Sequence, residues 1–203
     1  MTENIQEQRV GVVLAGGLGT RLRSVVDNLP KCMAPVAGHP FLYYLFRYMQ
    51  RQRFARVVLA LGYLHEMVEQ WVSETEWGFR VEFSVEQMPL GTGGAIKQAL
   101  KQIDEHQVFV LNGDTFFDVD LDRMERLHNS THAELTLALK PMTNFSRYGT
   151  VICDRNYRIE SFLEKQPRDK GNINGGIYLL DTAAMMDMLP EGRFSFETDV
   201  MEK

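Results

Sequence analysis

The hydrophobic pattern of the first 130 residues alternates between short apolar runs and segments with apolar residues at helical spacing. The runs 9–15, 55–61 and 107–111 are rich in valine and leucine and nearly continuous, which is typical of strands buried on both faces. The run 79–85 alternates as a half-buried strand does. Between and after these runs, the spacing predicts helices over residues 40–54, 65–73, 94–103 and 121–129.

Strands that alternate with helices favour a parallel sheet covered on both faces. Ligands of such sheets bind beyond the carboxyl ends of the strands, where the strand order reverses. Beyond residue 130 the pattern changes, and no long helix separates the later strand-like runs, so we expect antiparallel strands added to the same sheet. These runs are 134–139, 148–153, 158–163 and 173–180.

The end of the chain returns to helical spacing. A helix is predicted over residues 182–189, and another begins near Glu197. Because the sequence stops at Lys203 within this second helix, we expect a C-terminal segment of the natural protein to be missing.

Composition narrows the class of protein. With 203 residues, a single domain is expected, since domains usually have about 100–200 residues. The net charge of −5 argues against nucleic-acid binding, which needs a positive surface. Cys32 and Cys153 form no C-x-x-C pair, and the polar N-terminus resembles no signal peptide. No apolar run approaches the length of a membrane span, so we expect a soluble cytoplasmic protein with reduced thiols.

A glycine-rich loop directly follows the first predicted strand. Residues 14–22 read LAGGLGTRL, in which Gly16, Gly17 and Gly19 allow a ligand to approach the backbone. Free N–H groups at such a turn bind anions, and the forked cation of Arg21 suits phosphate oxygens. Lys31 follows ten residues later, after a proline.

Two other phosphate-binding motifs do not match this loop. A Walker A loop requires a closing Gly-Lys-Ser/Thr, which is missing from the sequence. A dinucleotide fingerprint requires a third glycine where Leu22 stands, which disfavours a Rossmann dehydrogenase. A turn that merely uses glycine remains the structural alternative, against which Arg21 and Lys31 argue.

Further polar clusters lie at two later turns. Asp114, in the motif Asn-Gly-Asp after a buried strand, is a suitable oxygen ligand for Mg²⁺, although an Asx turn is an alternative. The nearby Asp118, Asp120 and Asp122 are typical of helix caps. The bend QMPLGTGG over residues 87–94 would let a planar base approach the backbone; an ordinary helix start is the alternative.

The motif G-G-x-G-T-R-L followed by P-K resembles the signature of the sugar nucleotidyltransferases, and the similarity runs from residue 9 to the end. It implies a Rossmann-like, three-layer α/β/α fold with a mixed, mostly parallel sheet and a small antiparallel sugar-binding addition. We expect one domain over 1–203, with a nucleotide-binding half (9–130) and a sugar-phosphate-binding half (131–203). Cys32 departs from the proline that many relatives carry, without removing a phosphate contact.

The segments LRSVV, PLGTGGAI, VLNGDTFFDVDL, ALKPMTNFSRYGTV, NGGIYLL and FSFETD resemble most closely the members that transfer GMP from GTP to a heptose 1-phosphate. GTP and a sugar 1-phosphate are therefore the expected substrates. Alternatives are uridylyl or thymidylyl transfer to a hexose 1-phosphate, and a non-catalytic sugar-nucleotide-binding domain. The oligomeric state is open, with a homodimer among the alternatives.

The resemblance assigns roles to individual residues. The expected catalytic residues are Arg21, Lys31 and Asp114, and the expected Mg²⁺ ligands are Asp114 and Asp199. The expected nucleotide-binding residues are Leu14, Ala15, Gly16, Gly17, Gly19, Thr20, Arg21, Lys31, Gln87, Pro89, Gly91 and Thr92. The expected sugar-phosphate-binding residues are Asn112, Tyr148, Gly149, Glu164, Lys165, Asn174 and Gly175.

No histidine is assigned a catalytic role. His128 and His132 have helical spacing, but the residues between them are poor helix formers, and no glutamate completes an H-E-x-x-H motif. A phosphate monoester is mostly dianionic at pH 7, because its second pKa is about 6, so it needs no general base to attack another phosphate.

Overall fold

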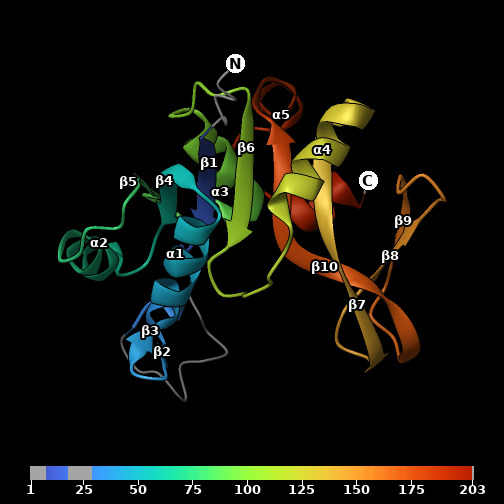
Figure 1. The fold of residues 1–203 in the computed structure, drawn as a ribbon, viewed down its shortest axis with the longest axis horizontal. Helices are drawn as coiled ribbons and strands as arrows, with labels where there is room; N and C mark the ends of the chain where they lie inside the picture. Colours follow the sequence, from blue (N-terminus) through green and yellow to red (C-terminus); the bar gives the residue numbers. More distant parts are fainter. Residues whose placement is uncertain (1–7, 18–28, 203) are drawn as a thin grey trace, which may run out of the picture.

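The computed structural model describes residues 8–17 and 29–202, which form an α/β fold around one large sheet (Figure 1). Its strands are ordered β5-β4-β1-β6-β10-β8-β9, and β7 also pairs with β10. Four neighbouring strands are parallel: β1 (Arg9–Leu14), β4 (Phe54–Leu61), β5 (Arg80–Val85) and β6 (Gln107–Asn112). The antiparallel strands are β7 (Leu135–Phe145), β8 (Thr150–Cys153), β9 (Ile159–Leu163) and β10 (Arg168–Asp181).

Helices cover both faces of the sheet and give three layers. One apolar core lies between the sheet and the helices α1 (Phe41–Arg51), α2 (His65–Ser73) and α4 (Leu121–Thr131). The second core lies between the sheet and the helices α3 (Gly91–Leu100) and α5 (Thr182–Met188). Alternate residues of a strand serve the two cores: Val13 faces the first and Val12 the second.

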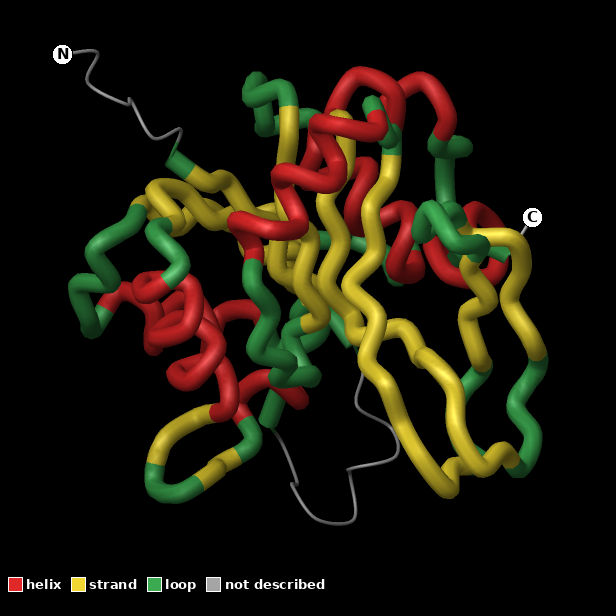
Figure 2. The backbone as a smooth tube through the Cα atoms, turned by 45° about the vertical axis from the view of Figure 1, so that its right-hand side comes forward, coloured by secondary structure: helices red, strands yellow, loops and turns green. Residues whose placement is uncertain are grey.

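The antiparallel strands extend beyond the parallel core. The last residues of β10 lie between β6, which pairs with Ile177 to Asp181, and β7, which pairs with Tyr178 to Leu180. The first residues of β10 pair with β7, and Asn172 also pairs with β8. In Figures 1 and 2 the lower halves of β7 and β10 leave the core and, with β8 and β9, form a separate lobe. Within the described ranges, no helix is long and apolar enough to cross a membrane.

Most predicted elements are confirmed. The errors concern the lengths of two strands and the bounds of one helix, where the sequence pattern gives no clear signal. The sequence predicted β7 and β10 too short. Their distal residues, such as Lys140 and Lys170, are exposed and show no alternation of apolar and polar residues that would indicate a strand. The predicted start and end of α3 are wrong, since this helix begins at Gly91 and ends at Leu100.

Shorter elements complete the chain. A 3₁₀ helix, η1 (Lys31–Met33), precedes the hairpin of β2 (Pro35–Val36) and β3 (His39–Pro40). A π-helix, η2 (Glu197–Met201), lies where the last helix is predicted. Asp120 caps α4 by accepting a hydrogen bond from the backbone N–H of Arg123 at 2.9 Å, as its position predicts.

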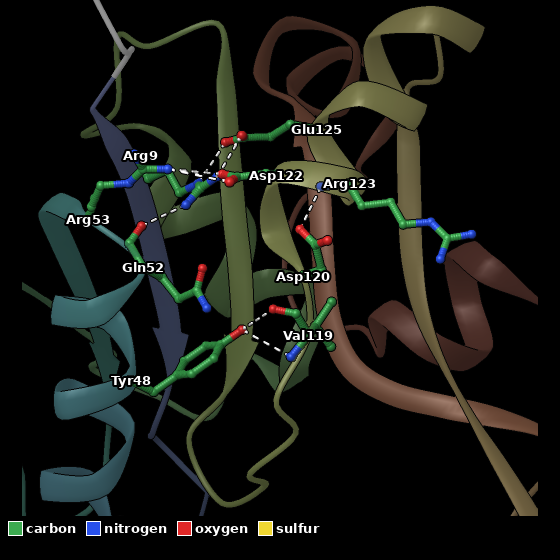
Figure 3. A network of polar contacts seen from close by, with 9 residues as sticks. All are labelled: Arg9, Tyr48, Gln52, Arg53, Val119, Asp120, Asp122, Arg123 and Glu125. Carbon is green, nitrogen blue, oxygen red and sulfur yellow. Dashed lines mark hydrogen bonds and ion pairs between the residues drawn. The ribbon is translucent and has the colours of Figure 1, made fainter.

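The amino end of β1 is anchored by a buried arginine (Figure 3). The guanidinium of Arg9 donates to both carboxylate oxygens of Glu125 at 2.8 Å, to Asp122 and to the carbonyl of Gln52 at 2.7 Å. Hydrogen bonding to Arg9 is the main cause that lowers the pKa of Asp122. Because Arg9 is only 7% exposed, it ties β1 to the end of α1 and to α4 without much competition from water.

A second link in the same region holds the turn between β6 and α4. Tyr48 is 1% exposed, and its hydroxyl donates to the carbonyl of Val119 at 3.1 Å (Figure 3). Its ring also packs edge-on against Phe116, with 5.7 Å between the ring centroids. Helix α1 thereby fixes the turn that follows β6.

Arg9→Met is expected to lower the free energy of unfolding by about 2–3 kcal/mol, because Gln52 and Glu125 lose a charged donor in a largely buried place. Urea denaturation measures the loss. Arg80→Met is the control, since Arg80 pairs with Glu82 but its side chain is 76% exposed, and its loss should stay within about 1 kcal/mol. Equal losses in both variants would contradict the anchoring role of Arg9.

Candidate active site

The parallel register brings the turns after the first strands to one edge of the sheet. Leu14, the last residue of β1, pairs with Ala60 on one side and with Asn112 on the other. The backbone N–H of Gly113 donates to the carbonyl of Leu14 at 2.9 Å, and the N–H of Ala15 donates to Ala60 at 2.9 Å. The chain turns from β1 to β4 and later to β6 on the other side of β1, so the strand order reverses here.

A lysine and an aspartate form an ion pair at this edge. Lys31, on η1, donates to Asp114 Oδ2, and the Thr115 hydroxyl donates to Asp114 Oδ1 at 3.2 Å. Both charged side chains are more than a third exposed, so other groups can reach them. The sequence predicted a catalytic role for both, and the structure brings them together over 83 residues of chain.

The residue between Lys31 and Met33 fixes this segment in the core. Cys32 is 1% exposed, and burial raises the pKa of its thiol to about 12. The thiol therefore stays protonated at neutral pH and is a packing group, although it stands next to a site lysine.

A glutamate that the sequence analysis did not single out lies beside the glycine loop. A Cβ atom on Gly16 would lie 3.2 Å from Oε1 of Glu86, whose Oε2 accepts a hydrogen bond from the N–H of Leu90 at 2.8 Å. Burial raises the pKa of Glu86 above the usual value for glutamate. The sequence could have indicated Glu86 by its position, because it directly follows β5 and precedes the predicted base-binding bend.

The start of α3 is fixed to the segment before η2. Gly91 has φ +72°, and added Cβ atoms would lie 2.4 Å from the Phe194 carbonyl at Gly91 and 2.0 Å from the Phe194 ring at Gly93. Glycine is thus required at both positions for this close approach. The hydroxyl of Thr92 donates to Glu197 Oε2 at 2.6 Å and accepts from the N–H of Phe196 at 2.9 Å.

Two of the predicted sugar-phosphate-binding residues meet around a tyrosine. Asn174 Nδ2 donates to the hydroxyl of Tyr178 at 2.9 Å, and Asn174 Oδ1 accepts from the N–H of Gly176 at 2.8 Å. Asn112 approaches the same place, since a Cβ atom on Gly176 would lie 2.7 Å from Asn112 Nδ2. Gly175 packs closely against Phe117.

The other predicted sugar-phosphate-binding residues lie on the antiparallel lobe. Thr150 pairs with Leu163, which places the pair Tyr148 and Gly149 beside the pair Glu164 and Lys165. All but Gly149 are exposed. The contacts described for these four residues do not connect them to Asp114 or Asn174.

The remaining predicted site residues lie in the turn before α3, near the start of η2, or outside the described residues. Gln87 and Pro89 are exposed in the turn before α3. Asp199 Oδ2 accepts a hydrogen bond from the N–H of Ser195 at 2.9 Å, which ties it to the start of the last helical segment. Gly19, Thr20 and Arg21 lie outside the described residues.

The donor set at Asp114 fits a hard divalent cation. Its carboxylate is exposed at the strand edge, and Mg²⁺ usually takes one or two carboxylates together with phosphate oxygens and water. In residues 8–17 and 29–202 no group of three His, Cys, Asp or Glu residues could hold a metal ion by itself. A metal at Asp114 would therefore depend on ligands from a bound phosphate.

Comparisons with known proteins agree on the family. The model of the nucleotidyl transferase family matches residues 10–202. The D-glycero-alpha-D-manno-heptose 1-phosphate guanylyltransferases of Aneurinibacillus thermoaerophilus and Campylobacter jejuni are 50% and 44% identical to this chain; the alignments cover 95% and 94% of it and 83% and 84% of the relatives. The crystal structure of HddC from Yersinia pseudotuberculosis complexed with GMP-PN aligns with a TM-score of 0.85 at 36% identity, over 96% of this chain and 85% of that one.

Lys31→Met and Asp114→Asn are each expected to change the free energy of unfolding by only about 0–1 kcal/mol, because exposed ion pairs contribute little to stability. Gly113→Ala, one residue from Asp114, should cost about 1–3 kcal/mol, since its Cβ would lie 2.6 Å from the Leu14 carbonyl. Urea denaturation compares the three variants. A loss for the charge variants as large as that for Gly113→Ala would show that the pair is structural.

Proposed function

Because this chain belongs to the nucleotidyl transferase family, we propose that it transfers GMP from GTP to D-glycero-α-D-manno-heptose 1-phosphate and releases pyrophosphate. The observation that carries the proposal is the Lys31–Asp114 pair at the point where the strand order reverses, beside the glycine loop. Two relatives that cover most of this chain and carry that activity in their names support the choice of substrates.

The reaction joins two anions, so charge and position dominate the catalysis. An oxygen of the sugar phosphate attacks the α-phosphorus of GTP, the bond to the β-phosphate breaks, and pyrophosphate leaves with the bonding electrons. The attacking phosphate needs no general base, since it is mostly dianionic at pH 7. Lys31 offsets the negative charge shared by the reacting phosphates, and Arg21, as the sequence predicts, offsets the charge on the leaving pyrophosphate.

Asp114 is proposed to hold Mg²⁺, which would neutralise charge on the phosphates when bound. Lys31 then has a second role, because its ammonium group balances the Asp114 carboxylate while no metal is bound. Asp199 is proposed as the second ligand from the resemblance; its Oδ2 also accepts the backbone N–H of Ser195.

Glu86 gives a physical reason for a preference for guanine. The Watson–Crick edge of guanine carries two adjacent donors, N1–H and N2–H₂, which a carboxylate can accept together. Uracil and thymine offer one donor between two acceptor carbonyls, so the same carboxylate would face repulsion from them. Glu86 lies between Gly16 and Leu90, where the predicted phosphate-binding and base-binding loops meet.

The protein with Mg²⁺ is expected to release pyrophosphate from GTP and the heptose 1-phosphate faster than from ATP, CTP or UTP, or from mannose or glucose 1-phosphate. A coupled assay for pyrophosphate over this substrate panel measures the preference. The Asp114→Asn variant gives the reference rate without this carboxylate. Its rate of pyrophosphate release should be about 100- to 1,000-fold lower, the usual cost of one lost charge-stabilising group. Turnover with UTP alone would overturn the guanylyl assignment. Tight nucleotide binding without turnover would instead indicate a non-catalytic binding domain.

Glu86→Gln is expected to lower kcat/KM for GTP by roughly 30- to 100-fold, because the guanine N–H groups lose a charged acceptor. Activity with UTP should change little or rise, since glutamine offers a donor to a carbonyl oxygen. Met88→Ala is the control, since Met88 is 73% exposed in the same turn and has no assigned role, and Gln87→Ala tests the base-binding role that the sequence predicts for Gln87. Loss of GTP selectivity in Gln87→Ala, with Glu86→Gln unaffected, would show that Gln87 reads the base.

A further inference from the structure

A chain of half-buried polar side chains lies beneath the site and begins at a fully buried tyrosine. Tyr178, on the last part of β10, is fully buried and packs edge-on against Phe196, with 5.4 Å between the ring centroids. Its neighbours in the apolar core include Val110, Ile96 and Met185. A hydroxyl group in such surroundings must be hydrogen-bonded, or its burial is costly.

The Tyr178 hydroxyl lies among polar groups from β10 itself, from β6 and from η2. It accepts from Asn174 Nδ2 at 2.9 Å, and the carboxylate of Glu197 and the amide of Asn112 face it as well. Burial raises the pKa of Tyr178, and the negative charge of Glu197 raises it further. The hydroxyl therefore stays protonated at neutral pH, with the Glu197 carboxylate facing it.

Glu197 continues the chain to the start of α3. Its Oε2 accepts from the hydroxyl of Thr92 at 2.6 Å and from the hydroxyl of Ser195 at 3.0 Å. Because the Thr92 hydroxyl donates to Glu197, it accepts from the N–H of Phe196, at 2.9 Å. The hydroxyls of Thr92 and Ser195 therefore both donate to the Glu197 carboxylate.

The backbone around this chain leaves little freedom. Gly176 has φ +75°, and a side chain there would collide with Asn112. Gly94 lies so close to Gly192 that a Cβ atom would come within 2.5 Å of the Gly192 carbonyl. These close contacts leave little room for a shift of Thr92 to be absorbed locally.

We propose that Tyr178 and Glu197 are positioning residues that couple the two substrates, so that a bound nucleotide at Thr92 orders Asn174 and Asn112 for the sugar phosphate. The proposal rests on the function proposed above, which assigns Thr92 to the nucleotide and the two asparagines to the sugar phosphate. By reciprocity, the sugar phosphate must tighten nucleotide binding by the same factor.

Two variants interrupt the chain at different points. Tyr178→Phe removes only a hydroxyl and keeps the ring against Phe196, and Glu197→Gln keeps the shape and removes the charged acceptor. Tyr44→Phe is the matched control, since it also deletes a tyrosine hydroxyl with a hydrogen bond, here 2.9 Å to the Val36 carbonyl on the β2–β3 hairpin.

The measurement is the Kd of a non-hydrolysable analogue of the nucleotide that the wild type uses, with and without a saturating amount of its sugar 1-phosphate, by calorimetric titration. In the wild type, the sugar phosphate should tighten nucleotide binding by roughly five- to tenfold or more. In Tyr178→Phe and Glu197→Gln this factor should fall towards one, while the Kd of the nucleotide alone stays close to that of the wild type. Tyr44→Phe should keep the full factor.

Wild-type coupling in both variants, or none in the wild type, would overturn the proposal. A general loss of nucleotide affinity together with a lower melting temperature in both variants would also contradict it, because that pattern belongs to a purely structural role. Use of a nucleotide other than GTP by the wild type would instead overturn the guanylyl assignment, and the coupling would still be measured with that nucleotide.

Discussion

The parallel pairing of β1 with β4 and β6 is the constraint on which the site depends. It brings Leu14, Ala60 and Asn112 into register, and the hydrogen bond from Gly113 to Leu14 continues that register by one residue beyond the strands. Backbone hydrogen bonds thus place Ala15, at the start of the glycine loop, and Gly113, in the Asn-Gly-Asp turn. Because a register shift of one residue would move every strand side chain to the other core, both apolar cores stabilise this arrangement.

Charges are used differently at the two ends of the sheet. At the amino end of β1, Arg9 is buried and its donors are taken up by Glu125, Asp122 and Gln52. At the carboxyl end, Lys31 and Asp114 pair with each other and remain more than a third exposed. A saturated, buried pair fixes structure, whereas an exposed pair can exchange its partner for a metal ion or a phosphate at low cost.

The sequence predicts the strands and most helices because their burial is periodic, and it predicts the turns of the site because glycine and aspartate follow buried strands. Asp114 could be found in this way. Glu86 could not be ranked from its pattern, since a carboxylate after a strand is usually exposed and its burial depends on Gly16 and Leu90. The start of α3 was missed for a related reason, because Gly91 and Gly93 signal a bend until the distant Phe194 is known to occupy the space beside them.

Glycines and side-chain hydrogen bonds contribute in different ways to this architecture. Glycines at 91, 93, 113 and 176 let main chain or side chains come closer than any other residue would allow, which removes slack from the turns. When the turns are rigid, a few hydrogen bonds, such as those of Thr92, Glu197 and Tyr178, are enough to hold the turns in fixed positions relative to one another. An enzyme that must align two anions by position and charge gains most from such rigidity, because a displaced phosphate loses in-line geometry and charge stabilisation at the same time.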